Sequence, residues 1–268
     1  MLHRRVNGYD MAYLEVGQGE PLVCVHGSLC DFRIWSPVLG PLSRRHSVIA
    51  VSLRHYFPEA WDGAGDDFTI EQHVDDVIGF LEMIGGKVDL LGHSRGGHIS
   101  FRIAQKRPDL LRRVVLAEPG GELDASLRSG NANPPPPGGE IVAAAKKIAA
   151  GDVDGGLEIF VDMIGGPGWW KRSPAATQQE RRDNAYTLVG QVNERRRAFS
   201  RADAEGIRVP SLFIGGADTG GLLAMIVNAL AAHVPGARLA IIPNTTHSMF
   251  VQDPVRFGEI VLDFLAGR

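Results

Sequence analysis

The sequence predicts an α/β protein with a doubly wound, mostly parallel sheet and an inserted helical cap. Short unbroken apolar runs alternate with helical patterns along most of the chain, and such runs are typical of parallel strands that helices cover on both faces. The alternation stops between residues 119 and 209, where no strand-like run occurs. We therefore expect a core of residues 1–118 and 210–268, interrupted by a helical cap at 119–209.

Eight segments are predicted as strands. The first two flank Asn7-Gly8, a pair that tolerates the positive φ angles of a tight hairpin turn. The predicted strands are His3–Val6, Tyr9–Val16, Leu22–Val25, Val48–Val51, Val88–Leu91, Val114–Ala117, Ser211–Ile214 and Arg238–Ile242.

Four helices are predicted in the core and three in the cap. The clearest, Thr69–Ile84, carries apolar residues at helical spacing, and Thr69 with Gln72 forms a candidate capping box. Asp253 is the expected N-cap of the last helix. The other core helices are Ser94–Arg107, Leu222–His233 and Pro254–Leu265, and the cap stretches are Ile141–Ala150, Leu157–Ile164 and Gln178–Arg197.

The predicted cap also contains a proline run, Pro134–Pro137, which favours an extended connector. The alternative is that residues 119–209 form two further layers of the same domain. The absence of strand-like runs before Ser211 favours the cap.

Composition and charge exclude several classes of partner. Lys and Arg total 28 against 31 Asp and Glu, a net charge of −3, so we expect no attraction to nucleic acid or to an anionic membrane. Cys24 and Cys30 are too few for a disulfide framework or a zinc site, which favours the cytoplasm. The N-terminal stretch lacks the apolar run of a secretory signal, and no apolar run approaches the roughly 18 residues of a membrane span. We expect a monomer or a homodimer.

The pattern G-x-S-x-G occurs at Gly92–Gly96, directly after a predicted buried strand and at the start of a predicted helix. Such a turn exposes the hydroxyl of Ser94 at the carboxyl edge of the sheet. A serine needs a base to act as a nucleophile, and His247 is the candidate because its polar loop follows the last strand at the same edge. His55 follows a strand and stays a minor pocket candidate, and the remaining histidines lie on helices, at the periphery or in packing positions.

These features resemble the α/β-hydrolase superfamily. The resemblance covers nearly the whole chain: His26-Gly27 after the third strand, the turn around Ser94, the late His247, and an insertion after the strand that ends near Ala117. The chain departs from the family at Leu53–Phe57, where many members have an Arg-Gly-His-Gly type of turn.

Two residues compete for the acid that orients His247. Asp218 stands where most members of the family place it, and it could instead cap the helix that begins near Leu222. Glu118 ends a strand and resembles the arrangement in haloalkane dehalogenases and zearalenone-type lactonases. A carboxylate buried at this place needs a partner such as an imidazolium. The sequence favours Glu118 and leaves Asp218 open.

The developing oxyanion needs two backbone N–H donors. Arg95, the residue after the nucleophile, should supply one, and the resemblance implies that Ser28 or Leu29 supplies the other. We expect the Arg95 side chain to be solvated or salt-bridged, and the run Arg195–Arg197 to be a solvated helix end. Candidate substrate-binding residues are Trp169 and Trp170 in the cap, which could equally be cap core, and Met249 and Phe250 beside His247.

The chemistry predicted from these residues is that of a serine hydrolase. Ser94, His247 and an acid would cleave a carboxylic ester or lactone of a hydrophobic small molecule through an acyl-enzyme, with no cofactor and no metal. Haloalkane dehalogenases and epoxide hydrolases are excluded because they use an aspartate where this chain has Ser94. The alternatives are a C–C bond hydrolase, a perhydrolase, a lyase or a cofactor-free oxygenase on the same fold, and a ligand receptor that retains the triad.

Overall fold

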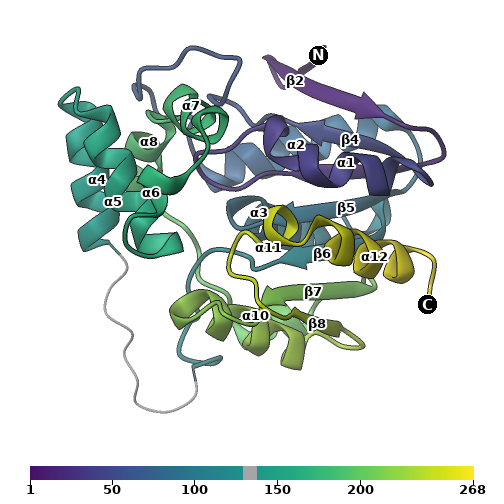
Figure 1. Ribbon diagram of the computed structural model, residues 1–268. Coiled ribbons are helices and arrows are strands. Elements are labelled where there is room, and N and C mark those ends of the chain that lie inside the picture. Colours follow the sequence, from purple (N-terminus) through teal and green to yellow (C-terminus); the bar gives the residue numbers. More distant parts are fainter. Residues whose placement is uncertain (129–137) are drawn as a thin grey trace.

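The computed structural model describes residues 1–128 and 138–268, so the predicted connector Pro134–Pro137 lies outside the described residues. Its centre is an eight-stranded sheet in the order β1-β2-β4-β3-β5-β6-β7-β8 (Figure 1). β1 pairs with β2 and β2 with β4 in antiparallel fashion, and all other pairs are parallel, which confirms the predicted fold class. The strands are β1 Leu2–Val6, β2 Tyr9–Val16, β3 Glu20–Val25, β4 His46–Val51, β5 Val88–His93, β6 Leu111–Ala117, β7 Ser211–Gly216 and β8 Arg238–Ile242.

The predicted hairpin and the predicted buried strands are both present. Asn7 and Gly8 have φ angles of 47° and 78°, as the tight turn between β1 and β2 requires. All six residues of β5 are buried because helices cover both faces of the sheet. This double cover is the reason that the central strands are mostly apolar, and the buried Asp89 of β5 is an exception that pairs with Arg112 at 3.1 Å.

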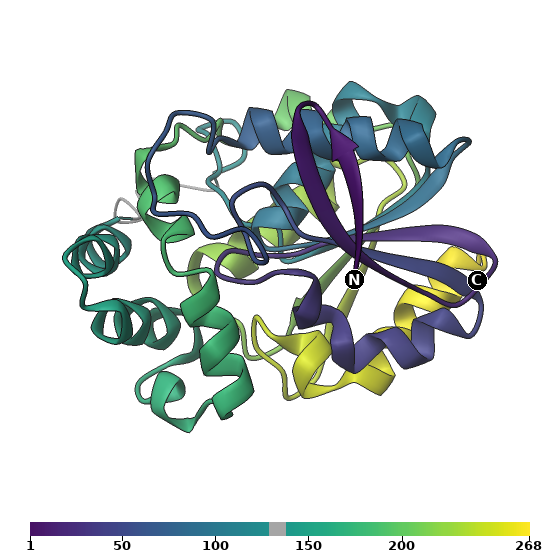
Figure 2. The same ribbon diagram turned by 90° about the horizontal axis from the view of Figure 1, so that it is seen from above.

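Helices pack on both faces of the sheet. α2, α3 and α10 share one apolar core with the sheet, and α1, α11 and α12 share a second core on the opposite face (Figure 2). The core helices are η1 Phe32–Trp35, α1 Ser36–Ser43, α2 Ile70–Ile84, α3 Arg95–Lys106, η2 Pro108–Leu110, α10 Gly221–His233, α11 Met249–Gln252 and α12 Pro254–Leu265. Thr69 and Asp253 cap α2 and α12, since their side chains accept from Gln72 N–H and Arg256 N–H. The predicted capping box is only half formed, because the Gln72 side chain donates to Asp76 Oδ1 at 2.9 Å.

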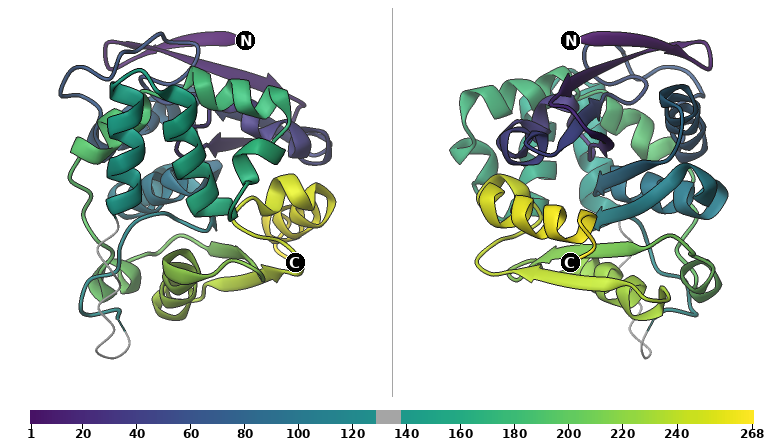
Figure 3. Two further views of the ribbon diagram at one scale, coloured as in Figure 1. Left: turned by 60° about the vertical axis from the view of Figure 1, so that its left-hand side comes forward. Right: turned by 90° about the vertical axis from the view of Figure 1, so that its right-hand side faces the viewer.

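The chain between β6 and β7 is helical wherever it has regular secondary structure among the described residues, and we call residues 119–209 the helical segment. α4 and α5 pack against each other, and α6 lies beside α5 (Figure 3). Its apolar side chains form a third cluster, which includes Ile148, Leu157 and Trp170 and also Leu29 of the loop after β3. The helices are α4 Gly139–Ala149, α5 Val153–Gly165, α6 Trp169–Arg172, α7 Ala175–Asp183, α8 Thr187–Asn193 and α9 Arg201–Glu205.

The predicted single helix Gln178–Arg197 is wrong. The helix breaks at Asn184, which is buried and whose side chain donates to Asp31 Oδ2 at 2.7 Å and accepts from the Phe57 N–H at 2.8 Å. These two contacts join the helical segment to the loops after β3 and β4 at the point where the helix ends. In the residues that the structure describes, no helix is both long and apolar enough to cross a membrane.

Candidate functional site

Ser94 stands in the sharp turn between β5 and α3. Its backbone has φ 53° and ψ −116°, a conformation that a serine adopts only when its surroundings impose it. A Cβ atom on Gly92 would lie 2.3 Å from the carbonyl oxygen of Gly96, and one on Gly96 would lie 2.1 Å from that of Val25. Only glycine fits at these two positions, which explains the G-x-S-x-G spacing, and the turn leaves Ser94 partly exposed.

His247 and Glu118 meet at the same edge of the sheet. His247 lies in the loop between β8 and α11, Glu118 directly follows β6, and His247 Nδ1 is 2.7 Å from Glu118 Oε2. The other carboxylate oxygen accepts from the Gly216 N–H at 2.8 Å. Glu118 is fully buried, so these two donors replace the water that it loses. Because the carboxylate accepts from Nδ1–H, the neutral ring presents a lone pair on Nε2.

Asp218, the alternative acid, is exposed beyond the end of β7. Its backbone N–H donates to Thr245 O at 2.9 Å, but within the described part of the chain its carboxylate has no hydrogen bond or ion pair. It does not cap α10 either, because that helix has Gly220 as its N-cap and no side-chain cap bond. The structure therefore brings Glu118, rather than Asp218, to His247.

A second histidine, His93, fixes the loop that carries His247. Its Nε2–H donates to the backbone carbonyl of His247 at 2.8 Å, and the two rings lie 4.4 Å apart. Burial holds the pKa of His93 well below its usual range, so its ring stays neutral. Since His93 precedes Ser94, these contacts tie the His247 loop to the turn. Ser94 Oγ itself has no hydrogen-bond partner among residues 1–128 and 138–268.

The loop after β3 packs directly against Ser94. A Cβ atom on Gly27 would lie 3.0 Å from Ser94 Cβ, and Leu29 is buried with a φ of 57°. The backbone N–H groups of Leu29 and Arg95 have no acceptor in the part of the chain that the structure describes. These two donors are therefore available to a ligand at this edge.

His26 holds this loop against the loop after β4. Its Nε2 accepts from the Leu53 N–H at 3.0 Å, so its Nδ1 carries the proton and donates to Gly27 O at 2.8 Å. The side chain is fully buried, and burial lowers its pKa to about 4. His26 is thus a neutral bridge between two loops.

Four buried histidines predict that the protein loses stability in weak acid. Their pKa values are lowered mainly by burial, whereas in the unfolded chain a histidine titrates near 6.5. Between about pH 6.5 and about pH 4 these histidines are therefore protonated in the unfolded chain but neutral in the native state. The free energy of unfolding falls as the pH is lowered through this range, by about 3 kcal/mol for His26. The four residues are His26, His73, His93 and His98.

Urea unfolding between pH 7 and pH 5 measures this loss. A His26→Gln variant should show a shallower pH dependence, by up to one proton, whereas His3→Gln, which replaces an exposed residue, should not. An unfolding free energy that stays constant from pH 7 to pH 5 would contradict the expectation.

The side chain of Arg95 forms a buried ion pair. It is fully buried and donates two hydrogen bonds to Glu194, at 2.5 and 2.7 Å. Of the two expected states, solvated or salt-bridged, the structure shows the salt bridge. Arg196 also donates to Glu194, at 2.7 Å, and residues 194–197 are not helical. The expectation of a solvated helix end at Arg195–Arg197 is therefore wrong in part: the stretch is not helical and Arg196 binds Glu194, whereas Arg195 and Arg197 are exposed as expected.

The candidate substrate-binding residues lie mostly in packed surroundings. Trp170 is buried in the core of the helical segment, and a Cβ atom on Gly165 would lie 2.5 Å from the indole ring of Trp169. Met249 is fully buried, and Phe250 stacks on Trp35 at 4.8 Å. Direct contact of any of these four side chains with a substrate stays a prediction.

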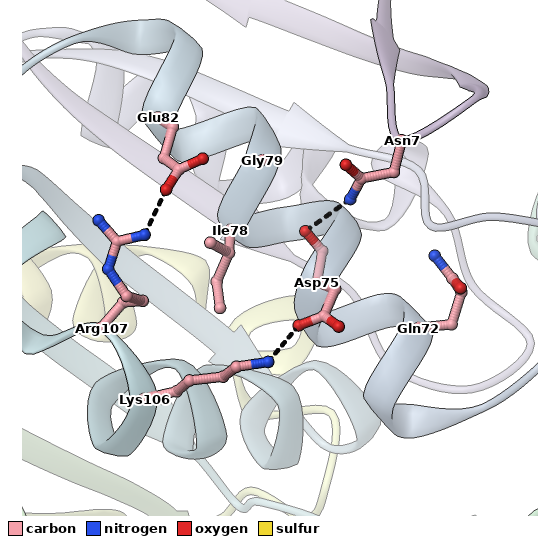
Figure 4. A pocket seen from close by; sticks show the side chains of 8 residues that line it. All are labelled: Asn7, Gln72, Asp75, Ile78, Gly79, Glu82, Lys106 and Arg107. Carbon is pink, nitrogen blue, oxygen red and sulfur yellow. Dashed lines mark hydrogen bonds and ion pairs between the residues drawn. The ribbon is translucent and has the colours of Figure 1, made fainter.

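A polar cavity of about 470 Å³ lies elsewhere, between the β1–β2 turn, α2 and the end of α3 (Figure 4). Its charged side chains already pair with one another: Lys106 with Asp75 at 2.5 Å, and Arg107 with Glu82. None of the residues proposed for catalysis lines it. Within the described ranges, no cluster of three or more His, Cys, Asp or Glu residues could hold a metal ion.

Sequence reasoning missed several residues that shape this site. Gly120 is one, since a Cβ atom there would lie 3.5 Å from Ser94 Oγ. Glu194 behind Arg95 and Gln191, whose Oε1 accepts from Ser28 Oγ at 2.5 Å, are two others. No local pattern marks them, because each acts through a contact with a residue far away in the sequence.

Comparisons with known proteins agree with this architecture. An uncharacterized protein from Mycobacterium tuberculosis is 26% identical over 98% of this chain and 80% of its own. The enol-lactonase from Burkholderia xenovorans has a TM-score of 0.79 at 22% identity and covers 99% of this chain and 100% of its own. Carboxylesterase CesB from Bacillus subtilis has a TM-score of 0.78 at 18% identity, over 100% of this chain and 91% of its own. The model of the alpha/beta hydrolase family matches residues 22–260, and the chain therefore belongs to that family.

Proposed function

We propose that the protein is a serine hydrolase that cleaves a carboxylic ester or a lactone of a hydrophobic small molecule. The observation that carries this proposal is the buried contact between His247 Nδ1 and Glu118 Oε2, 2.7 Å long, at the sheet edge where the turn presents Ser94. Membership of the hydrolase family supports it, as do the similar folds of the enol-lactonase and the carboxylesterase.

In the proposed mechanism Ser94 Oγ attacks the substrate carbonyl while His247 Nε2 takes its proton. Glu118 keeps the ring in the tautomer that leaves Nε2 free, and it stabilises the imidazolium that forms. His247 then gives the proton to the leaving alcohol, or to the alkoxide end of an opened lactone. Water attacks the acyl-enzyme in the same way and releases the acid.

The oxyanion of each tetrahedral intermediate would accept from two backbone N–H groups. Arg95 N–H stands at the start of α3, where the helix dipole favours negative charge. Leu29 N–H is the second candidate, with Ser28 N–H as the alternative in the same loop. The N–H groups of Arg95, Leu29 and Ser28 all lack an acceptor among the described residues, which supports Arg95 together with one donor from this loop.

The helical segment is proposed to act as a cap that selects the substrate. It contributes its own apolar cluster, and that cluster includes Leu29 from the loop beside Ser94. If this apolar cluster lines the substrate pocket, it favours a substrate whose acyl or alcohol group has apolar surface. The domain boundaries that we propose are those expected from the sequence, with core residues 1–118 and 210–268 and cap residues 119–209.

Covalent labelling tests the proposal directly. A fluorophosphonate should phosphonylate the purified protein once, with peptide mass spectrometry placing the adduct on Ser94, and prior labelling should abolish hydrolysis of an aryl ester. A panel of esters and lactones graded in acyl length would then rank substrates by kcat/KM. Labelling at another residue, or full activity of the labelled protein, would reject Ser94 as the nucleophile.

A further inference from the structure

The loop Ser28–Cys30 holds a conformation that its own sequence does not favour. Leu29 has a φ of 57°, in the left-handed region that is costly for a side chain with a Cβ atom and persists only where contacts impose it. If Leu29 N–H is an oxyanion donor, as proposed above, the contacts that impose this backbone also decide where the donor points.

Two side chains hold the peptide groups on either side of Leu29. Cys30 Sγ donates to the carbonyl of Ser28 at 3.3 Å. Arg181, on α7, donates through Nη1 to the carbonyl of Leu29 at 2.8 Å and also contacts Cys30 Sγ as a donor. The contacts thus form a chain from the arginine, through the thiol, to the carbonyl of Ser28.

The geometry of the peptide bond turns these contacts into control of the donor. Ser28 C=O and Leu29 N–H belong to one planar, trans peptide unit, so the N–H points opposite to the carbonyl. A hydrogen bond that fixes this carbonyl therefore fixes the direction of the N–H. It also polarises the unit, which makes the N–H a stronger donor.

Arg181 is itself held in place. Only 16% of its side chain is exposed, and Nη1 lies 3.1 Å from Glu180 Oε1. An arginine buried to this degree gains little net stability over an apolar side chain of similar size. Its hydrogen bonds to the loop give it a role that an apolar residue could not fill.

We infer that Arg181 and Cys30 are positioning residues, which aim the Leu29 N–H of the proposed oxyanion hole through the chain of hydrogen bonds from Arg181 to the Ser28 carbonyl. The inference rests on the proposed function and extends it to the helical segment. The cap would then do more than enclose the substrate, because one of its helices would hold part of the catalytic apparatus in shape.

Kinetics of Arg181→Met in the full chain test the inference. With an aryl ester as substrate, kcat should fall about 10- to 100-fold, which is no more than the fall in kcat expected when a whole oxyanion donor is removed. KM should change less than about threefold. The inhibition constant of an aryl trifluoromethyl ketone, whose adduct with the serine carries the oxyanion, should rise in step with the loss of kcat/KM. Arg181→Lys, which keeps a donor, should recover part of both.

The matched control is Arg182→Met, which removes the next arginine of α7. Its guanidinium pairs with Asp154 within the helical segment and does not contact the loop, so kcat and the inhibition constant should keep their wild-type values. Should Arg181→Met fail to fold, as judged by circular dichroism, Cys30→Ala and Cys30→Ser replace it. The alanine variant should lose kcat, and the serine variant, which keeps a donor, should retain more of it.

Two results would overturn the inference. One is a kcat of Arg181→Met within twofold of the wild type, and the other is a loss of kcat with unchanged affinity for the trifluoromethyl ketone. Ser94→Ala in the same series separates these results from failure of the proposed function. If Ser94→Ala keeps its activity, the proposed function fails, whereas an inactive Ser94→Ala beside a fully active Arg181→Met rejects the positioning role alone.

Discussion

Replacing Ser94 with alanine is expected to lower kcat for an aryl ester by about 10⁵- to 10⁶-fold, because no other group in the proposed mechanism can form the acyl-enzyme. A residual rate of about 10³-fold above the uncatalysed reaction should remain, since the oxyanion donors and the binding surface are untouched. The measurement is initial-rate kinetics of the purified variant, after the fluorophosphonate has been shown no longer to label it.

Ser100→Ala provides the matched control for this substitution. Ser100 lies on α3 below the turn, is buried, and its hydroxyl has no hydrogen-bond partner among the described residues. Removing that hydroxyl should leave kcat within about threefold of the wild type and should not lower the stability, because an unsatisfied buried polar group is lost. Equal activity of Ser94→Ala and Ser100→Ala would mean that the nucleophile is elsewhere.

The second large effect is expected for Glu118→Gln, with a fall in kcat of about 10³- to 10⁴-fold. The amide can still accept the Gly216 N–H through its oxygen, but it then presents an NH₂ group to His247 Nδ1. The ring would have to carry its proton on Nε2, where the mechanism needs a lone pair. Stability should change less than activity, since the substitution keeps the shape of the side chain.

Asp218→Asn is the comparison that decides between the two acids. Because Asp218 is exposed and only its backbone contacts the His247 loop, this variant should keep kcat within about twofold. The pair is best measured side by side, with kcat under saturating substrate and the melting temperature of each protein. A large loss in Asp218→Asn together with an active Glu118→Gln would reverse the assignment of the acid.

The sheet could be predicted from the sequence because its signal is local. Strands buried on both faces are mostly apolar, and β3, in which Leu22–Val25 are all apolar and buried, is the clearest case. Helix α1, by contrast, received no prediction. Its interior contains Gly40 and Pro41, which disfavour helices, whereas Pro37 stands in the first turn, where proline is tolerated. The helix forms because its apolar side packs on the sheet and on α12.

The sequence favours Glu118 but does not decide between the two acids, and here the reason is different. Glu118 and Asp218 each follow a parallel strand, so both reach the same edge of the sheet. Only the three-dimensional backbone distinguishes them: Glu118 has a φ of 40° and lies under the His247 loop, whereas Asp218 is turned toward solvent. Sequence periodicity carries no information about such single-residue turns.

The remaining contacts of the site join distant parts of the chain. Arg181 and Asn184 each contact the loop after β3, more than 150 residues earlier in the sequence. Glu194 likewise reaches back to Arg95. A single sequence gives no sign of such distant contacts. The prediction of one helix over Gln178–Arg197 is wrong for the same reason, since the helix ends at Asn184, whose contacts are with distant residues.

Three residues of the site have left-handed backbone conformations, and these limit which substitutions could stabilise the protein without loss of the proposed activity. Within the described part of the chain, six residues other than glycine have positive φ, and three of them are Leu29, Ser94 and Glu118, with φ of 57°, 53° and 40°. Each such backbone is expected to cost about 1–3 kcal/mol. Relief of this strain would favour glycine at Ser94, which is only partly buried, whereas at Leu29 and Glu118 glycine would also remove a fully buried side chain. A search for thermostable variants should hold Ser94 and Glu118 fixed, because the substitution that relaxes the backbone at either position would remove a side chain proposed to take part in the reaction.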